Sequence, residues 1–123
     1  MTIQECYQQL GGDFAQAEKR LSNGTLVERF ITKFLDDSSF SELCIAMDKY
    51  DHNKAFRAAH TLKGVSGSLR LTTLHSSASQ LAELLRAESK NIPAGADLLF
   101  EEVKRDYELT VSAIRAYLDS DHG

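Results

Sequence analysis

The chain has 123 residues, a hydrophobic content of 42% and a net charge of −4, from 14 Lys and Arg against 18 Asp and Glu. This length suits a single domain with a real core and leaves no room for a second domain. The acidic balance and the lack of a basic block argue against nucleic acid as a partner. No apolar run approaches the ~20 residues that span a bilayer, and the polar start of the chain is unlike a signal peptide, so we expect a cytoplasmic protein that does not enter the membrane.

The two cysteines suggest neither a disulfide nor a zinc site. Cys6 and Cys44 lie far apart and form no Cys-x-x-Cys pattern, so we interpret both as reduced, half-buried thiols. No Glu-x-x-His pair is present on which a di-iron helix bundle could be built. We therefore expect no metal and no other cofactor in this chain.

The first part of the chain predicts two short helices. The sequence has one proline and little polar and apolar alternation, which indicates an all-α protein. A capping box over residues 2–5 opens a helix that stops at Gly11 and Gly12, and Asp13 caps a second helix that ends near Leu21. We interpret residues 1–24 as an N-terminal elaboration that packs on the remaining helices, with a capping or docking role as the alternative.

Residues 25–119 predict a bundle of longer helices. A helix over residues 25–35 is followed by one over about 39–50 that starts in a second capping box, Ser39 to Glu42. Helices over about 53–70 and 72–87 come next, the second capped by Thr72 or Thr73, and Pro93 opens the first turn of the last helix, which ends near Asp119. The positions expected to point inward before the 53–70 helix are Leu26, Val27, Phe30, Ile31, Phe34, Phe40, Leu43, Cys44 and Met47. The corresponding positions after it are Leu74, Ala78, Leu81, Leu85, Phe100, Val103, Tyr107, Val111, Ile114 and Leu118. These helices predict an antiparallel four-helix bundle, with residues 120–123 as a frayed tail.

The helix over residues 53–70 presents a histidine. Lys63, Gly64 and Gly67 fall within roughly 60° of His60 around the helix axis. Ala58, Leu62, Val65 and Leu69 form an apolar stripe on the opposite side, which must face the core. His60 is therefore expected to be exposed beside an ammonium group, and a neutral imidazole there has a ring nitrogen able to attack phosphorus. His52, His75 and His122 are interpreted as ordinary surface residues.

Two glycines inside one helix cost roughly 2 kcal/mol relative to alanine, which suggests a use other than helix stability. Close approach of another surface is one explanation, and a larger residue such as glutamine at Gly67 is then expected to leave the isolated bundle intact. The alternative is that Gly67 relieves crowding between helices.

At these residues the chain resembles the histidine-containing phosphotransfer (HPt) family, whose motif runs roughly His-x-x-Lys-Gly-x-(Ala/Ser)-x-x-x-Gly. His60, Lys63, Gly64 and Ser66 match the motif, whereas Arg70 stands where the family usually has glycine. In the family a polar residue on the following helix often reaches toward the phosphoryl group. The aligned position here is Ala82, and Ser79 or Arg86 could take its place.

The resemblance implies a free-standing protein that relays a phosphoryl group between the aspartates of receiver domains. His60 would accept the phosphoryl group and Lys63 would balance its charge, while Mg²⁺ would be held by the receiver. The residues expected to dock the receiver are Phe56, Arg57, Gly64, Gly67 and Ser68. The partners would be response-regulator receivers and a hybrid histidine kinase, and the protein is expected to be a monomer. No glycine-rich nucleotide loop is present, so we expect no autophosphorylation from ATP and no enzyme activity of its own.

Three other interpretations remain open. An HPt-like bundle could serve only as a protein-binding adaptor, for which Arg70 and Ala82 are the arguments. The chain could be akin to the phosphoacceptor domain of a chemotaxis kinase, although the dimerisation and ATP-binding parts are missing. A purely structural bundle would be expected to dispense with two glycines around an exposed histidine.

Overall fold

The computed structural model describes residues 1–86 and 91–120. These residues form seven helices and no strand: α1 (Ile3–Leu10), α2 (Phe14–Leu21), α3 (Gly24–Phe34), α4 (Ser39–Asp48), α5 (His52–Ser68), α6 (Thr72–Leu85) and α7 (Ala96–Asp119). The all-α prediction is confirmed. The tail at residues 121–123, which includes His122, and the expected helix end at Ala87 lie outside the described residues.

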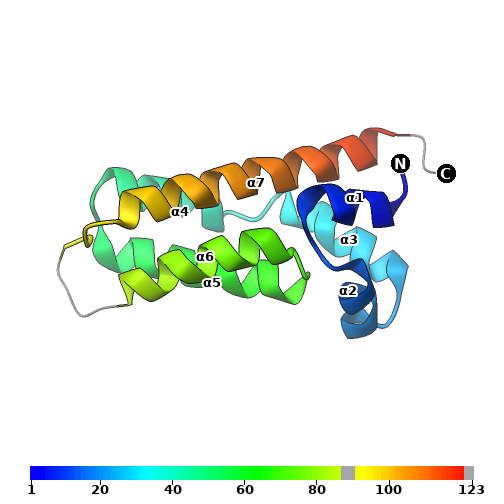
Figure 1. Cartoon of the computed structure of the whole chain (residues 1–123), viewed down its shortest axis with the longest axis horizontal. Coiled ribbons are helices and arrows are strands. Elements are labelled where there is room, and N and C mark those ends of the chain that lie inside the picture. Colours follow the sequence, from blue (N-terminus) through cyan, green and yellow to red (C-terminus); the bar gives the residue numbers. More distant parts are fainter. Residues whose placement is uncertain (87–90, 121–123) are drawn as a thin grey trace.

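Helices α4 to α7 form the bundle. Helix α5 packs between α4 and α6, and α6 packs in turn on α7 (Figure 1). Helices α3 and α4 follow one another along the length of the bundle, separated by the break at residues 35–38. The antiparallel four-helix bundle with additional N-terminal helices is confirmed.

The bundle core is built from the stripes that helical periodicity selects. Leu62 from α5, Leu74 and Leu81 from α6, and Val103 and Ile114 from α7 are completely buried. Aromatic rings close the gap between α3, α4 and α7, where Phe40 stacks on Tyr107 at 3.9 Å between ring centroids. These contacts hold α5 with one side against the core and leave its other side facing solvent.

The N-terminal helices are tied to the turn between α5 and α6. Helix α1 packs along α7, and the Tyr7 hydroxyl donates a hydrogen bond to the Leu69 carbonyl at 2.8 Å. The backbone N–H of Asp13 donates to the Arg70 carbonyl at 3.0 Å, and both the N–H and the hydroxyl of Thr73 donate to the Gly11 carbonyl at 3.0 Å. Residues 1–24 therefore contact the end of the helix that carries His60, as well as α7.

Two expected side-chain caps, the start of the last helix and one core position are wrong. Neither Ser39 nor Thr72 caps a helix with its side chain: α4 begins after Ser38, and α6 begins after Leu71, neither with a side-chain cap. The Thr73 hydroxyl instead donates a hydrogen bond to the Gly11 carbonyl, a contact that no local sequence pattern predicts. The last helix begins at Ala96 after Gly95, so Pro93 precedes it rather than lying in its first turn.

Phe30 is 39% exposed, although it was expected to point inward. Its neighbours Val27, Ile31 and Phe34 fill the α3 side of the core, so the buried stripe is narrower than the apolar pattern suggests. No helix among the described residues is long and apolar enough to cross a membrane.

Candidate functional site

The sequence around His60 folds into one uninterrupted helix. Asp51 caps its start, because the Asp51 carboxylate accepts a hydrogen bond from the Lys54 N–H at 3.1 Å. Ala55, Ala59 and Leu62 are completely buried on one side of α5. His60 is exposed on the other side, as expected.

Two neighbours on α5 shape the surface around the imidazole. The half-buried Phe56 ring lies one turn before His60, with 5.9 Å between ring centroids and an interplanar angle of 30°. Gly64 lies one turn after it, and a Cβ built there would meet nothing within 4 Å. The imidazole therefore has an aromatic wall on its N-terminal side and open backbone on its C-terminal side.

Gly67 faces a side chain of the same molecule. A Cβ at Gly67 would lie 2.8 Å from both Cε1 and Nδ1 of His75 on α6. The His75 ring cannot easily move away, because its Nδ1 is hydrogen bonded to the Lys63 carbonyl at 2.8 Å. Since a carbonyl only accepts, Nδ1 carries the proton. The expectation that glutamine is tolerated at Gly67 is therefore wrong, and crowding between α5 and α6 explains this glycine, whereas a docking role for it stays a prediction.

His75 is the residue that the sequence interpretation missed. It is half-buried between α5 and α6 rather than an ordinary surface histidine. The signal that could have found it is the pairing of a glycine near the end of one helix with a large polar residue in the first turn of the next.

The buried polar residue Ser66 is satisfied within α5. Its hydroxyl is hydrogen bonded to the Leu62 carbonyl at 2.7 Å, with a longer contact of 3.2 Å to the Lys63 carbonyl. Lys63 itself is half-buried, and its carbonyl accepts hydrogen bonds from both Ser66 and His75. The turn that carries Lys63 is fixed by contacts from its own helix and from α6.

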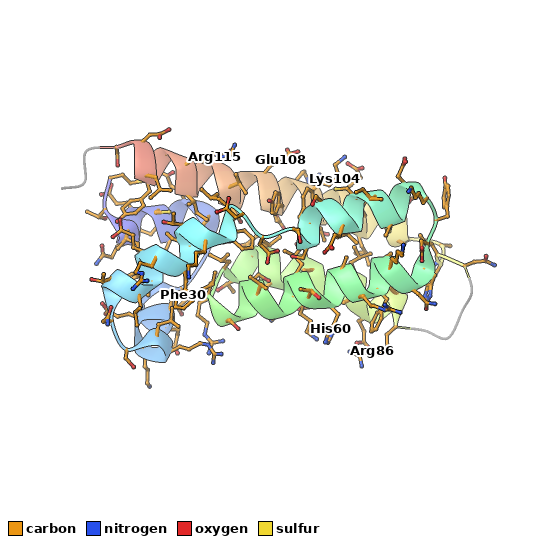
Figure 2. All side chains as sticks on the ribbon, turned by 180° about the vertical axis from the view of Figure 1, so that it is seen from behind. Phe30, His60, Arg86, Lys104, Glu108 and Arg115 are labelled. Carbon is orange, nitrogen blue, oxygen red and sulfur yellow. The ribbon has the colours of Figure 1, made fainter. Side chains whose placement is uncertain are left out.

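After α5, Arg86 lies near the surface around His60, whereas the Ser79 hydroxyl is hydrogen bonded within α6. Ala82 is completely buried and offers no polar group. The Ser79 hydroxyl donates to the His75 carbonyl at 2.6 Å, so it serves its own helix. The Arg86 guanidinium lies 5.9 Å from the centre of the Phe56 ring, the same ring that lies beside His60. Figure 2 shows His60 and Arg86 along the same edge of the bundle.

The docking candidates Ser68 and Gly64 line a shallow groove between α3 and α5. Phe30, Lys33, Thr61 and Val65 are also part of this groove. The exposed Phe30 ring, which the core does not use, is therefore on the same surface as Gly64. Arg57 is exposed one turn before His60 and lines a different groove, between α4 and α5.

Arg70 ends α5 in the conformation that glycine prefers. Its φ is 55°, and its N–H donates to the Gly67 carbonyl at 3.1 Å while the Leu71 N–H donates to the Ser66 carbonyl at 2.9 Å. These two bonds make a Schellman motif, which normally has glycine at this position. Arg70 therefore adopts a left-handed conformation at the position where the family motif usually has glycine.

The other reactive side chains lie away from this surface. Burial raises the pKa of the Cys6 thiol to about 11 and also raises the pKa of Cys44. Among the residues that the structure describes, no group of three or more His, Cys, Asp or Glu side chains could hold a metal ion.

A family model described as the Hpt domain matches residues 8–119. The chain belongs to the Hpt family. No curated protein and no solved structure matches the chain. Membership gives this Hpt domain a general role in histidine phosphotransfer within a two-component phosphorelay, and Hpt domains are phosphoryl carriers that interact with receiver domains and histidine kinases.

Proposed function

We propose that His60 carries the phosphoryl group and passes it between the aspartates of two receiver domains. The single observation that supports this assignment best is the exposure of His60 on a helix whose opposite side is buried. Of the four histidines, His52 and His75 are half-buried, and His122 lies outside the described residues.

Apart from the Mg²⁺ held by the receiver, the transfer needs no group that this chain lacks. A ring nitrogen of His60 attacks the phosphorus of an aspartyl phosphate, so that an N–P bond forms and the P–O bond to the aspartate breaks. The carboxylate leaves with the bonding electrons, and the proton on the other ring nitrogen is released to water. In the second step the other ring nitrogen takes a proton back from water and a receiver carboxylate attacks phosphorus. The electron pair of the N–P bond returns to the ring nitrogen, which leaves His60 as the neutral imidazole.

Two cations would stabilise the phosphohistidine. Lys63 lies three residues after His60, where its ammonium group acts as a point charge. Arg86 replaces the polar residue that Ala82 does not supply, because its guanidinium already packs on the Phe56 ring beside His60. Its partner Glu83, at 3.2 Å, is exposed and would give way to a phosphoryl group, because exposed ion pairs contribute little.

The other groups of the transfer belong to the surface around His60 and to the receiver. Phe56, Arg57, Gly64 and Ser68 belong to the docking surface, and a hybrid histidine kinase supplies the first receiver. Mg²⁺ is held by the receiver and this chain binds no cofactor and no ATP. The protein works as a monomer in the cytoplasm, where such receivers receive their signal.

A second candidate is an adaptor that binds receivers without accepting phosphate. The buried Ala82, at the position where the family often has a polar residue, favours it. The two functions differ in one observable, the presence of a phosphoryl group on His60.

The test is to incubate the protein with a phosphorylated receiver and to locate the label. We expect acid-labile label on the wild type, as an N–P bond gives, and none above background on His60→Gln. His52→Gln is the matched control, because it removes a histidine from the start of the same helix, and it should be labelled like the wild type. Acid-stable label, or label that persists in His60→Gln, would remove His60 from the mechanism, and receiver binding without any label would favour the adaptor.

A further inference from the structure

Helix α6 contacts α5 both before and after His60 along the chain. Four residues before His60, the Phe56 ring centre lies 5.9 Å from the guanidinium of Arg86, the residue that follows α6. Three residues after His60, the Lys63 carbonyl oxygen lies 2.8 Å from Nδ1 of His75, in the first turn of α6. The two ends of α6 therefore meet the His60 helix on either side of the imidazole.

The His75 ring reaches the backbone of α5 because Gly67 has no side chain. A Cβ at Gly67 would lie 2.8 Å from Nδ1 and Cε1 of His75, closer than such atoms approach one another. An interior carbonyl of an α-helix already accepts the N–H four residues later, and it accepts a second hydrogen bond only where a donor can come close. The glycine thus opens α5 at the Lys63 carbonyl to a donor from the next helix.

Two side chains converge on the Lys63 carbonyl. The Ser66 hydroxyl lies 3.2 Å from it and belongs to α5 itself, so this contact moves with the helix. The shorter bond from His75 comes from α6 and ties the Lys63 peptide to another element. Because this carbonyl and the Lys63 side chain leave the same residue, holding the peptide also holds the direction in which the side chain starts.

His75 has no donor left for a phosphoryl group. A neutral imidazole carries one N–H, and in His75 this is the Nδ1–H that the Lys63 carbonyl accepts. The ring also packs over Gly67, which lies seven residues after His60 and therefore about 10 Å further along the helix axis. Any effect of His75 on the chemistry at His60 must consequently pass through α5.

We propose that His75 is a positioning residue for phosphoryl transfer and acts through Lys63. This inference rests on the proposed function, in which the Lys63 ammonium group balances the charge of the phosphoryl group on His60. The hydrogen bond from α6 fixes the Lys63 peptide, so the ammonium group meets the phosphoryl group without first ordering the turn that carries it. Without this bond His60 keeps its nucleophilic nitrogen, but the charge that forms on it is balanced less well.

Labelling by phosphoramidate tests the role of His75 without a receiver. A ring nitrogen of His60 forms the N–P bond and ammonia leaves, and the rate constant is counted above the label of the His60→Gln protein. His75→Leu should lower this rate constant ~5-fold or more, because small misplacements near reacting atoms are costly. His75→Asn should restore it to within about 2-fold of the wild type, since its amide N–H takes the place of Nδ1–H. His75→Gln carries the same amide one carbon further out and should not restore it.

The control on the same turn is Ser76→Ala, at an exposed site that should label like the wild type. A double mutant then separates positioning from a general structural effect. Lys63→Ala alone should lower the rate constant at least as much as His75→Leu. Adding His75→Leu to Lys63→Ala should cost less than about 2-fold, because residues that act through one another are not additive.

An equal loss from His75→Leu with and without Lys63→Ala would overturn the inference, as would a His75→Leu protein that labels like the wild type. Circular dichroism shows whether each variant is folded. If His75→Leu is not folded, the comparison of His75→Asn with His75→Gln decides, and equal rate constants for these two would overturn the inference. A wild type that phosphoramidate labels on His60 but no phosphorylated receiver labels would overturn the proposed relay and not the role of His75. A wild type labelled by neither would overturn both.

Discussion

The two glycines of α5 have different roles, although both lie within about two turns of His60. Gly64 is exposed with open space beyond it, so its missing side chain leaves room for something outside the chain. Gly67 is half-buried, and the imidazole of His75 stands where its Cβ would be. The hydrogen bond from His75 to the Lys63 carbonyl then fixes the α5 turn next to His60.

A pair of alanine substitutions separates the two roles. Gly67→Ala should lower the free energy of unfolding by about 1 to 3 kcal/mol, because overpacking against His75 outweighs the better helix propensity of alanine. Gly64→Ala, its control, should raise it by about 0.5 to 1 kcal/mol. Urea unfolding followed by circular dichroism measures both. A Gly67→Ala protein as stable as the wild type would show that the α5–α6 contact is looser than the His75 geometry indicates.

At the scale of the helices, the end of α5 connects the His60 helix to the rest of the fold. Arg70 adopts a left-handed conformation there, and its carbonyl accepts the Asp13 N–H. Its Nε is buried and has no hydrogen-bond partner among the residues that the structure describes. The Arg70 backbone is thus strained, and one polar atom of its side chain lacks a hydrogen bond. This residue both ends α5 and accepts a hydrogen bond from the N-terminal region.

Restoring glycine at this helix end should stabilise the protein. Arg70→Gly is expected to raise the free energy of unfolding by about 1 kcal/mol, because glycine adopts a positive φ without the steric cost that other residues meet. Arg86→Gly is the control, since residue 86 has a φ of −67° and gains nothing from glycine. Thermal unfolding of the two variants tests this. A destabilised Arg70→Gly would mean that the arginine side chain holds the turn through its contact with the Gly67 carbonyl.

The sequence predicted the helices well and their tertiary partners poorly. The apolar stripe of α5 was enough to predict that His60 is exposed, because one helix face must be buried. The expected side-chain cap of α6 was wrong because the Thr73 hydroxyl donates to the Gly11 carbonyl, 62 residues away, and local capping patterns contain no such information. The Gly67–His75 contact was missed for the same reason: helical rotation gives the direction of a residue, but not what the next helix places there.

For the molecule as a whole, the N-terminal helices and the bundle support one exposed surface. Residues 1–24 contact the α5–α6 turn through Tyr7, Asp13 and Gly11. Helix α5, which carries His60, contains three basic residues and no acidic one, whereas α7 contains six acidic residues against three basic ones. A carrier that meets two partners in turn needs such a surface to be accessible and rigid, because transfer requires close alignment of the reacting atoms.

The most direct test of the relay is the onward transfer from the purified phosphoprotein. The protein is labelled, freed of its donor, and mixed with an unlabelled receiver in the presence of Mg²⁺ and without ATP. The account predicts that label leaves His60 and appears on the receiver as an acyl phosphate, and that a receiver lacking its phosphorylatable aspartate takes none. Label that remains on this protein with every receiver that binds it, or that reaches the aspartate-free receiver equally well, would contradict the account.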